Sequence, residues 1–253
     1  MLDVKVGARP LPPYSLFADF YTVHIAPYLK DAWEASFRSM VLHRLRSTRA
    51  CADVACGPGL AAVCLAETFD LVFAVDVSLP MLLQAGRMLR GAKVMLLRQD
   101  MRFLRLPCRV DLINCWGDSL NHLIREEDFL WALRSFAVNL ERGGLLYFDL
   151  NTENQLREGA GEEWYEMEMP SGRARWRLSW EGEGKTSLLE VVFYDAGNRE
   201  IGREVIRERV YPREMVLALL SRAGFSPLEW VDAATLRPPA GDARRVAVLA
   251  ERL

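Results

Sequence analysis

Apolar residues follow two different periods along the chain, and the change of period divides it into regions. Between residues 14 and 46, aromatic and aliphatic side chains recur at helical spacing, which predicts two helices that meet near Pro27. From Ala50 onward, short apolar runs alternate with helix-like stretches. The runs cover residues 52–55, 71–75, 94–97, 112–115 and 145–148. This alternation predicts an α/β fold with parallel strands and helices on both faces of the sheet.

Start and stop signals mark the helices between these strands. A glycine just after the last periodic residue is typical of a helix end. The pattern predicts helices over 60–68, over 80–90 before Gly91, and over 126–140 before Gly143 and Gly144.

The pattern changes again after Asn151, where alternating residues and turn residues predict an antiparallel insert. Its expected strands are 162–169, 173–180, 187–194 and 201–211, and its turns are 170–172, 182–184 and 196–198. A helix over 212–222 and strands over 225–231 and 246–249 are expected to follow. The sequence thus predicts an amino-terminal helical cap (1–46), an α/β domain (47–155 and 212–253) and the antiparallel β insert (156–211).

Composition and charge narrow the class of protein. The 253 residues are 51% hydrophobic and 26% charged, which is typical of a globular chain. The 32 Lys and Arg residues against 34 Asp and Glu give a net charge of −2, which disfavours nucleic acid as a partner. Residues 1–15 lack the features of a secretory signal, and the apolar stretches are too short to span a membrane. We therefore expect a cytoplasmic protein with no membrane partner.

The cysteines and histidines give no sign of a metal site. The five cysteines are odd in number and include no Cys-x-x-Cys pair, which favours reduced core thiols over disulfides or zinc. His24, His43 and His122 are scattered along the chain. The sequence predicts no bound metal.

A glycine motif stands where the first predicted strand turns into a helix. In the segment Asp53–Gly59, Gly57 and Gly59 allow the backbone to approach a ligand closely, and the helix that follows offers free N–H groups. Asp76 ends the second strand, where a carboxylate can accept hydrogen bonds from both hydroxyls of a ribose. The motif therefore predicts a cofactor that carries a ribose.

The identity of that cofactor needs further residues, because 57–62 also fits the relaxed dinucleotide pattern G-x-G-x-x-A. A carboxylate at Asp53, inside a buried strand, is costly unless a cation lies near it, and S-adenosylmethionine carries two. Asp100 and Met101 follow the third strand, where an acid can accept the adenine amino group and an apolar side chain can cover the ring. There is no Tyr-x-x-x-Lys pair for hydride chemistry. These features favour S-adenosylmethionine, with an NAD(P)-dependent oxidoreductase as the alternative.

In order and spacing, four segments resemble the successive motifs of class I S-adenosylmethionine-dependent methyltransferases. The segments are Asp53–Gly59, Asp76, Asp100–Met101 and Asp111–Asn114, and the resemblance extends over residues 14 to 150. It implies a Rossmann-like, seven-stranded, mostly parallel sheet whose last strand is antiparallel. It also implies roles for the motif residues: Ala55, Gly57 and Gly59 around the methionine moiety, Asp76 at the ribose, Asp100 and Met101 at the adenine, and Val77 and Met81 on the other side of that ring.

A narrower resemblance is to sugar N-methyltransferases and glycine-type N-methyltransferases, in which a Tyr-rich helix precedes the first motif and an antiparallel insert follows the fifth strand. Tyr14 and Tyr21 match the opening tyrosines of that group. With the flanking motif residues, the expected cofactor site comprises Tyr21, Asp53, Ala55, Cys56, Gly57, Gly59, Asp76, Val77, Met81, Gln99, Asp100, Met101, Cys115 and Trp116.

The resemblance implies methyl transfer to a nitrogen or oxygen of a small molecule. In such a displacement the protein chiefly orients the two reactants and excludes water from them. If a base is used, the loop after the fourth strand lies where acceptors bind, and it contains His122, whose residue type titrates near neutrality. Asp118 and Tyr14 are the alternative catalytic residues. A catalytically idle protein that binds the cofactor is a second hypothesis, because the sequence shows no unambiguous base.

The predicted insert carries alternating arginines and tryptophans. The arginines are Arg173, Arg175, Arg177, Arg203, Arg207 and Arg209, and the tryptophans are Trp164, Trp176 and Trp180. Alternating arginines are typical of a solvated sheet face, and a site for an acidic or phosphorylated substrate is the sharper interpretation. The tryptophans fit an acceptor pocket, core packing, or a homodimer contact equally well.

Overall fold

The computed structural model describes residues 10–169 and 172–253. Part of the predicted cap (1–9) and the predicted turn residues Pro170 and Ser171 lie outside the described residues. Two sheets make up the fold, one of seven strands and one of four. Within the described ranges, no helix has both the length and the apolar character needed to cross a membrane.

The larger sheet has the strand order β10-β11-β5-β4-β1-β2-β3. Its strands are β1 (Ala50–Val54), β2 (Leu71–Asp76), β3 (Val94–Arg98), β4 (Val110–Cys115), β5 (Leu140–Asn151), β10 (Phe225–Asp232) and β11 (Arg245–Arg252). β1 pairs in parallel with β2 and β4, while β11 runs antiparallel to both β5 and β10. The predicted seven-stranded, mostly parallel sheet with an antiparallel last strand is confirmed.

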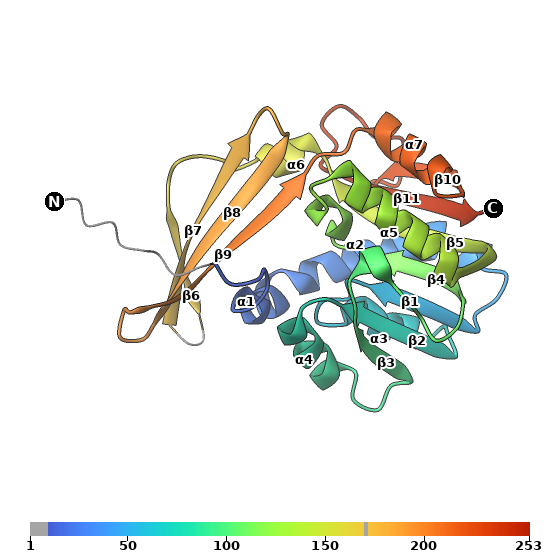
Figure 1. Ribbon diagram of the computed structural model, residues 1–253, viewed down its shortest axis with the longest axis horizontal. Helices are drawn as coiled ribbons and strands as arrows, with labels where there is room; N and C mark the ends of the chain where they lie inside the picture. The colour runs from blue at the N-terminus through green and yellow to red at the C-terminus, as the bar shows by residue number, and fades with distance from the viewer. Residues whose placement is uncertain (1–9, 170–171) are drawn as a thin grey trace.

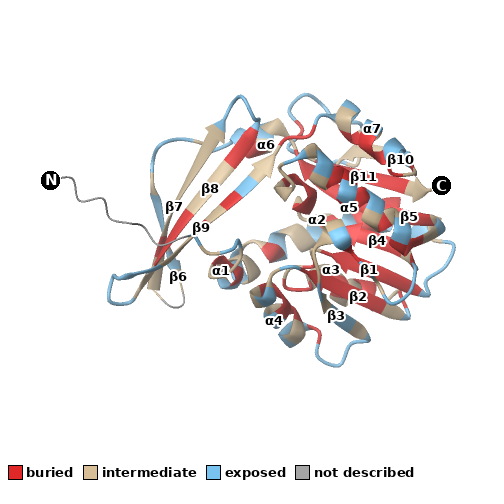
Figure 2. Ribbon diagram, viewed as in Figure 1, coloured by how far each residue is buried: buried red, intermediate tan, exposed pale blue. Residues whose placement is uncertain are grey.

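Strand alternation separates two hydrophobic cores, one on each face of this sheet. In β5, Leu146 and Phe148 join one core, while Leu145 and Tyr147 join the other. Helices α5 (Glu126–Asn139) and α7 (Arg213–Arg222) cover the first face, and α2 (Ala26–Met40), α3 (Leu60–Leu65) and α4 (Leu79–Met88) cover the second. Figure 2 shows the buried residues concentrated along the strands of this sheet. Burial on both faces explains why β1, β2 and β4 read as continuous apolar runs in the sequence, whereas β3, at the edge of the sheet, is apolar but largely exposed.

The glycines after α5 have a different role from the one predicted. The helix ends at Asn139, and Gly143 and Gly144 lie inside β5 instead of ending the helix. The register between β4 and β5 shifts there, from Val110 opposite Leu140 to Leu112 opposite Leu145. Gly143 adopts a φ of +74°, a conformation that glycine tolerates at the irregularity.

The smaller sheet is the antiparallel insert, with the order β6-β7-β8-β9. Its strands are β6 (Tyr165–Met169), β7 (Gly172–Glu181), β8 (Thr186–Asp195) and β9 (Glu200–Arg209). Helix α1 (Phe17–His24) lies between this sheet and the main domain (Figure 1). Phe17 of α1 packs on Ala174, Phe193 and Ile206 of the insert. Shorter elements connect these parts: η1 (Leu42–Arg44), η2 (Met101–Phe103), η3 (Ser119–His122) and α6 (Glu153–Arg157).

One buried acid ties the insert to the amino-terminal helix. Glu204 of β9 is fully buried, and its Oε1 accepts hydrogen bonds from the backbone N–H groups of Leu16 and Phe17, at the start of α1. A carboxylate at a helix amino terminus is stabilised by the helix dipole and the free N–H groups. Strand β9 therefore fixes the position of the helix that carries Tyr21 and follows Tyr14.

Candidate functional site

A crevice opens at the carboxyl ends of β1 and β4, where α1 and α2 cover the sheet edge. The empty space within it, including the part that is open to solvent, is about 440 Å³. The lining residues are Tyr21, Ala26, Leu29, Lys30, Trp33, Asp53, Ala55, Cys56, Gly57, Pro58, Leu60, Ala61, Trp116 and Gly117. Six residues of the expected cofactor site are thus brought together here: Tyr21, Asp53, Ala55, Cys56, Gly57 and Trp116.

The glycine loop forms one wall of the crevice. After β1 the backbone turns through the left-handed region at Ala55 (φ +57°) and Gly57 (φ +52°). The N–H of Gly57 donates to Oδ2 of Asp76 over 2.9 Å, and the N–H of Ser78 donates to Oδ1 over 2.8 Å. Burial is the main cause that raises the pKa of Asp76. The acid on the second strand therefore lies directly against the loop, as the motif spacing predicts.

Gly59 faces helix α4 rather than the crevice. It precedes α3 with a φ of +87°, and a Cβ there would come within 3.1 Å of Leu89 and 3.3 Å of Ala85. A larger residue would push α3 and α4 apart. The second glycine therefore permits close helix packing, and its role at the cofactor stays a prediction.

Asp53 is a buried carboxylate with one free oxygen. Its Oδ1 accepts a 2.6 Å hydrogen bond from Asn114, whose own Oδ1 accepts a 2.9 Å bond from the indole of Trp33. Its Oδ2 is buried and has no hydrogen-bond partner among the described residues. Burial raises the pKa of Asp53 from 3.8 to about 7, with Asn114 opposing the shift and Asp76 adding to it. An unpartnered buried oxygen is costly, so it marks a place for a donor or a cation.

Trp116 supplies the complementary group in the same crevice. Its ring stacks on Tyr147 with centroids 5.1 Å apart, and its buried Nε1–H has no partner in the part of the chain that the structure describes. Lys30, which sequence analysis missed, also lines the crevice and lies 3.5 Å from Glu34. The free oxygen of Asp53 can accept hydrogen bonds from the ammonium of an amino acid. Trp116 and Lys30 can donate to its carboxylate.

Other expected cofactor residues lie on the neighbouring strand ends, outside the crevice. Val77, just after β2, is 61% exposed, whereas Met81 in the first turn of α4 is buried. Asp100 pairs with Arg102, 2.6 Å away, and these bonds lower its pKa although burial opposes the shift. The Gln99 amide bonds both backbone groups of Arg105, so it closes its own loop.

Two further expected residues lie mainly in the hydrophobic core. Cys115, at the end of β4, is fully buried on the face that α5 covers. Met101, the first residue of η2, packs partly buried against the same core. Their contact with a cofactor stays a prediction.

Tyr14 and His122, two of the predicted catalytic residues, contact each other beside Tyr21, which lines the crevice. The hydroxyl of Tyr14 lies 3.2 Å from Nε2 of His122, and Nδ1 of His122 lies 3.2 Å from the backbone oxygen of Arg207. Since that oxygen can only accept, the neutral ring carries its proton on Nδ1, and the Tyr14 hydroxyl donates to Nε2. Burial raises the pKa of Tyr14 well above 10, so the phenol keeps its proton.

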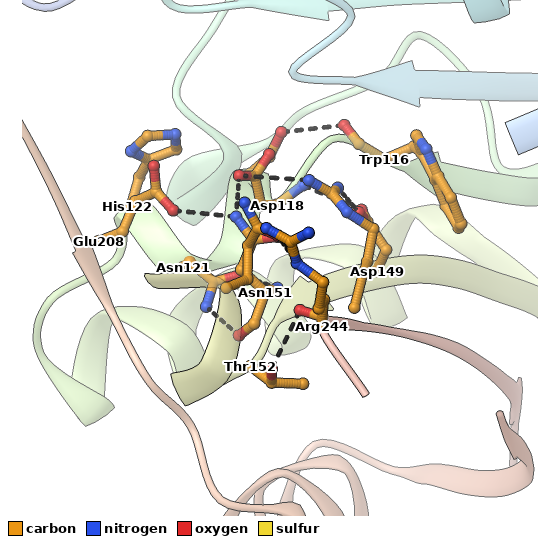
Figure 3. A network of polar contacts seen from close by, with 12 residues as sticks. Trp116, Asp118, Asn121, His122, Asp149, Asn151, Thr152, Glu208 and Arg244 are labelled. Carbon is orange, nitrogen blue, oxygen red and sulfur yellow. Dashed lines mark hydrogen bonds and ion pairs between the residues drawn. The ribbon is translucent and has the colours of Figure 1, made fainter. Parts of the chain in front are cut away.

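Asp118, the third predicted catalytic residue, belongs to a polar network that sequence analysis did not predict (Figure 3). Asn151 donates through Nδ2 to Asp118 Oδ2 and to Glu208 Oε2, the latter over 3.2 Å. Arg245 pairs with Asp149 and lies 3.7 Å from Asp118. In the sequence, Asp149 and Asn151 gave a signal, because both end a buried strand, whereas nothing distinguished Glu208.

Comparison with known proteins agrees with this geometry. Residues 51–144 match the family described as "Methyltransferase domain". The dTDP-3-amino-3,6-dideoxy-alpha-D-glucopyranose N,N-dimethyltransferase of Streptomyces fradiae is 30% identical over 239 residues, 89% of this chain and 90% of that protein. An S-adenosylmethionine-dependent methyltransferase from Clostridium acetobutylicum ATCC 824 has a similar structure, with TM-score 0.81 and 24% identity over 94% of this chain and 98% of that one. A sugar N-methyltransferase from Streptoalloteichus sp ATCC 53650 gives TM-score 0.74 and 23% identity over 100% and 98%.

The strand order, the glycine loop and the acid on the adjacent strand define a Rossmann-like methyltransferase fold. The chain belongs to the S-adenosylmethionine-dependent methyltransferases. The predicted fold, cofactor and enzyme class are confirmed, and the comparisons favour methyl transfer over the nicotinamide alternative.

Proposed function

We propose that this enzyme transfers the methyl group of S-adenosylmethionine to a nitrogen or oxygen of a small molecule, held between the glycine loop and the insert. The observation that carries the proposal is the free Oδ2 of Asp53, a buried carboxylate oxygen in a crevice beside the loop. The names of relatives, which include sugar and glycine/sarcosine N-methyltransferases, support a small acceptor.

In this proposal Asp53 binds the ammonium of the cofactor, and Trp116 and Lys30 bind its carboxylate. Asp76 binds the ribose; each of its oxygens accepts one backbone N–H and keeps a lone pair for a hydroxyl. Val77, Met81, Asp100 and Met101, at the ends of β2 and β3, surround the adenine.

Bound S-adenosylmethionine supplies a methyl carbon already activated by a sulfonium charge. The protein therefore has to orient the acceptor, exclude water and take up a proton. The Tyr14 hydroxyl donates its hydrogen bond to Nε2 of His122, so the lone pairs of its oxygen are free to accept a proton from the methyl acceptor while Nε2 receives the phenolic proton.

The predicted insert (156–211) would act as a lid, and the predicted helical cap (1–46) would cover the space between the glycine loop and the insert. We also propose a cytoplasmic location, with no nucleic-acid or membrane partner. The insert would form the contact of a homodimer, and light scattering tests that oligomeric state.

Calorimetry with S-adenosylmethionine and its demethylated product tests the cofactor site, and transfer of a radiolabelled methyl group to a panel of small amines and alcohols tests turnover. We expect micromolar binding of both cofactor forms and label in the small-molecule fraction. Binding without label on any acceptor would favour the catalytically idle protein. A fluorescence response to NADH without binding of S-adenosylmethionine would overturn the proposal.

Replacing Asp76 with alanine should weaken S-adenosylmethionine binding about 10- to 100-fold, because two charge-assisted hydrogen bonds to the ribose are lost. Asp70→Ala is the matched control, since Asp70 is exposed and lies just before the first residue of the strand that Asp76 ends. Calorimetry of both variants measures the effect. Equal affinities for the two variants would remove Asp76 from the ribose site.

A further inference from the structure

Carboxylates outnumber cations in the network beside His122. Asp118, Asp149 and Glu208 contribute three acids, and Arg245 is the guanidinium that contacts them among the described residues. His122, which lies beside Glu208 in Figure 3, adds no positive charge while its Nε2 accepts the hydrogen bond from the Tyr14 hydroxyl. With all three acids ionised, the network would carry a net charge of −2. A partly enclosed site of that charge is unfavourable unless it binds protons or a cation.

Asn151 shows where a ligand for this network is missing. Both hydrogens of its Nδ2 point to carboxylates, one to Asp118 and one to Glu208. If the Asn151 amide were flipped, its oxygen would face two carboxylates. The hydrogen-bond network therefore fixes which atom is Nδ2 and which is Oδ1. Its Oδ1 is then an acceptor with no partner among residues 10–169 and 172–253, on a side chain that is only 6% exposed. Two acids thus share one amide nitrogen as their donor, and the oxygen of the same amide is left without a donor.

Two of the three acids in the network keep part of their surface accessible. Glu208 is partly exposed, and the Asp118 side chain keeps 17% of its surface accessible, whereas Asp149 is fully buried behind them. Burial raises the pKa of Glu208, and the charge of Asp118 adds to the shift, while the hydrogen bond from Asn151 and the charge of Arg245 oppose it. The buried Asp149 already has Arg245 as its counter-ion. The unbalanced pair is therefore Asp118 with Glu208.

We infer that Glu208 is a specificity-determining residue, which binds the methyl acceptor as an ammonium together with Asp118 and the Oδ1 of Asn151. This inference rests on the proposed function, and it selects an amine over an alcohol. A neutral hydroxyl would leave the acid pair uncompensated, whereas an ammonium neutralises one charge and offers a hydrogen to each of three acceptors. To free its lone pair, the ammonium breaks one N–H bond and gives that proton to the Tyr14 oxygen, while Nε2 of His122 receives the phenolic proton. The nitrogen keeps the electron pair, and the net charge is unchanged.

The test compares Glu208→Gln with Glu190→Gln, a matched loss of one carboxylate from the insert, where Glu190 pairs with Arg177 away from the network. Methylammonium chloride is the probe, and sodium chloride at equal concentration is the ionic control. With the demethylated cofactor bound, methylammonium should raise the Tm of the wild type and of Glu190→Gln by about 2–4 °C, and leave Glu208→Gln unchanged. Among labelled acceptors, amines should predominate over matched alcohols, and Glu208→Gln should lower kcat/KM for amines about 100-fold, mainly through KM.

Calorimetry with S-adenosylmethionine separates this inference from the proposed function, because Glu208 lies outside the cofactor crevice. Two outcomes would overturn the inference alone, provided that the cofactor binds normally. In one, methylammonium raises the Tm of Glu208→Gln as much as that of the wild type; in the other, it leaves the Tm of the wild type unchanged. If Glu208→Gln does not fold, Glu208→Asp keeps the charge and should retain a smaller methylammonium response. The inference would also be contradicted if methylammonium failed to raise the Tm of a folded Glu190→Gln variant.

Discussion

Arginine in place of Gly57 is expected to reduce S-adenosylmethionine affinity more than 100-fold while leaving the protein folded. A Cβ at this position would lie 3.8 Å from Tyr21, an ordinary contact, so the first carbon is accommodated. The longer stem and the guanidinium extend into the crevice that Gly57 lines. They would occupy ligand space and place a cation near Asp53, where the cofactor ammonium is proposed to bind. Calorimetry and a thermal melt of the same sample measure both parts of the prediction.

Gly91→Arg is the matched control for backbone strain. Gly91 also has a left-handed φ, +82°, and a Cβ there would meet no atom within 4 Å. Each substitution places a non-glycine residue in that region at about 1–3 kcal/mol, so both variants should lose similar stability. Only Gly57→Arg should lose cofactor affinity. Gly57→Ala should bind nearly as well as the wild type, and loss of binding in that variant would assign the effect to strain instead of blocked space.

The strands and the glycine loop were predictable because their signals are local. A parallel strand with both faces buried is apolar throughout, so the runs at 71–75 and 112–115 identify β2 and β4 directly. Gly57 and Asp76 lie at the carboxyl ends of adjacent parallel strands, and those ends share one edge of the sheet. Their contact follows from topology once the strands are known.

The network around Glu208 was not predictable for the opposite reason. Glu208 and Asn151 are separated by 57 positions, and β9 alternates acids and arginines as a solvated edge strand does. Only the docking of the insert on the main domain brings that carboxylate against Asn151. Lys30 did leave a signal, because it is a charged residue one helical turn before Trp33, on the side of α2 that lines the crevice.

Backbone strain at the site also had no counterpart in the sequence. Three of the non-glycine residues with positive φ are Tyr14 (+59°), Ala55 (+57°) and Asp118 (+52°); Ala55 lines the crevice, Tyr14 contacts His122, and Asp118 belongs to the polar network around Asn151. Such conformations cost about 1–3 kcal/mol each and persist where the surrounding structure holds them. The surrounding structure sets these backbone conformations and with them the direction of the side chains. Residue type alone does not predict either.

Asparagine in place of Asp53 is expected to make the cofactor-free protein relatively more stable at high pH. In the folded chain the pKa of Asp53 rises from 3.8 to about 7 because the carboxyl is buried. Between those values the folded state binds more protons than the unfolded state, so stability falls as pH rises through this window. The asparagine side chain does not bind a proton in this range, so it adds no such pH dependence to the stability. The Tm of Asp53→Asn minus that of the wild type should increase between pH 5 and pH 8, by the equivalent of up to about 3 kcal/mol.

The same substitution should weaken S-adenosylmethionine binding about 100- to 1,000-fold at pH 8, since the buried ammonium would lose its charged partner. Wild-type affinity should fall as pH drops below about 7, because Asp53 must give up a proton to bind the cation. Calorimetry at pH 6 in two buffers of different ionisation enthalpy should detect that proton in the wild type and not in Asp53→Asn. Asp70→Asn, the same change at an exposed acid, should alter neither stability nor affinity. If Asp53→Asn binds the cofactor as the wild type does, with the same pH dependence, the ammonium is held elsewhere and the free oxygen of Asp53 has another partner.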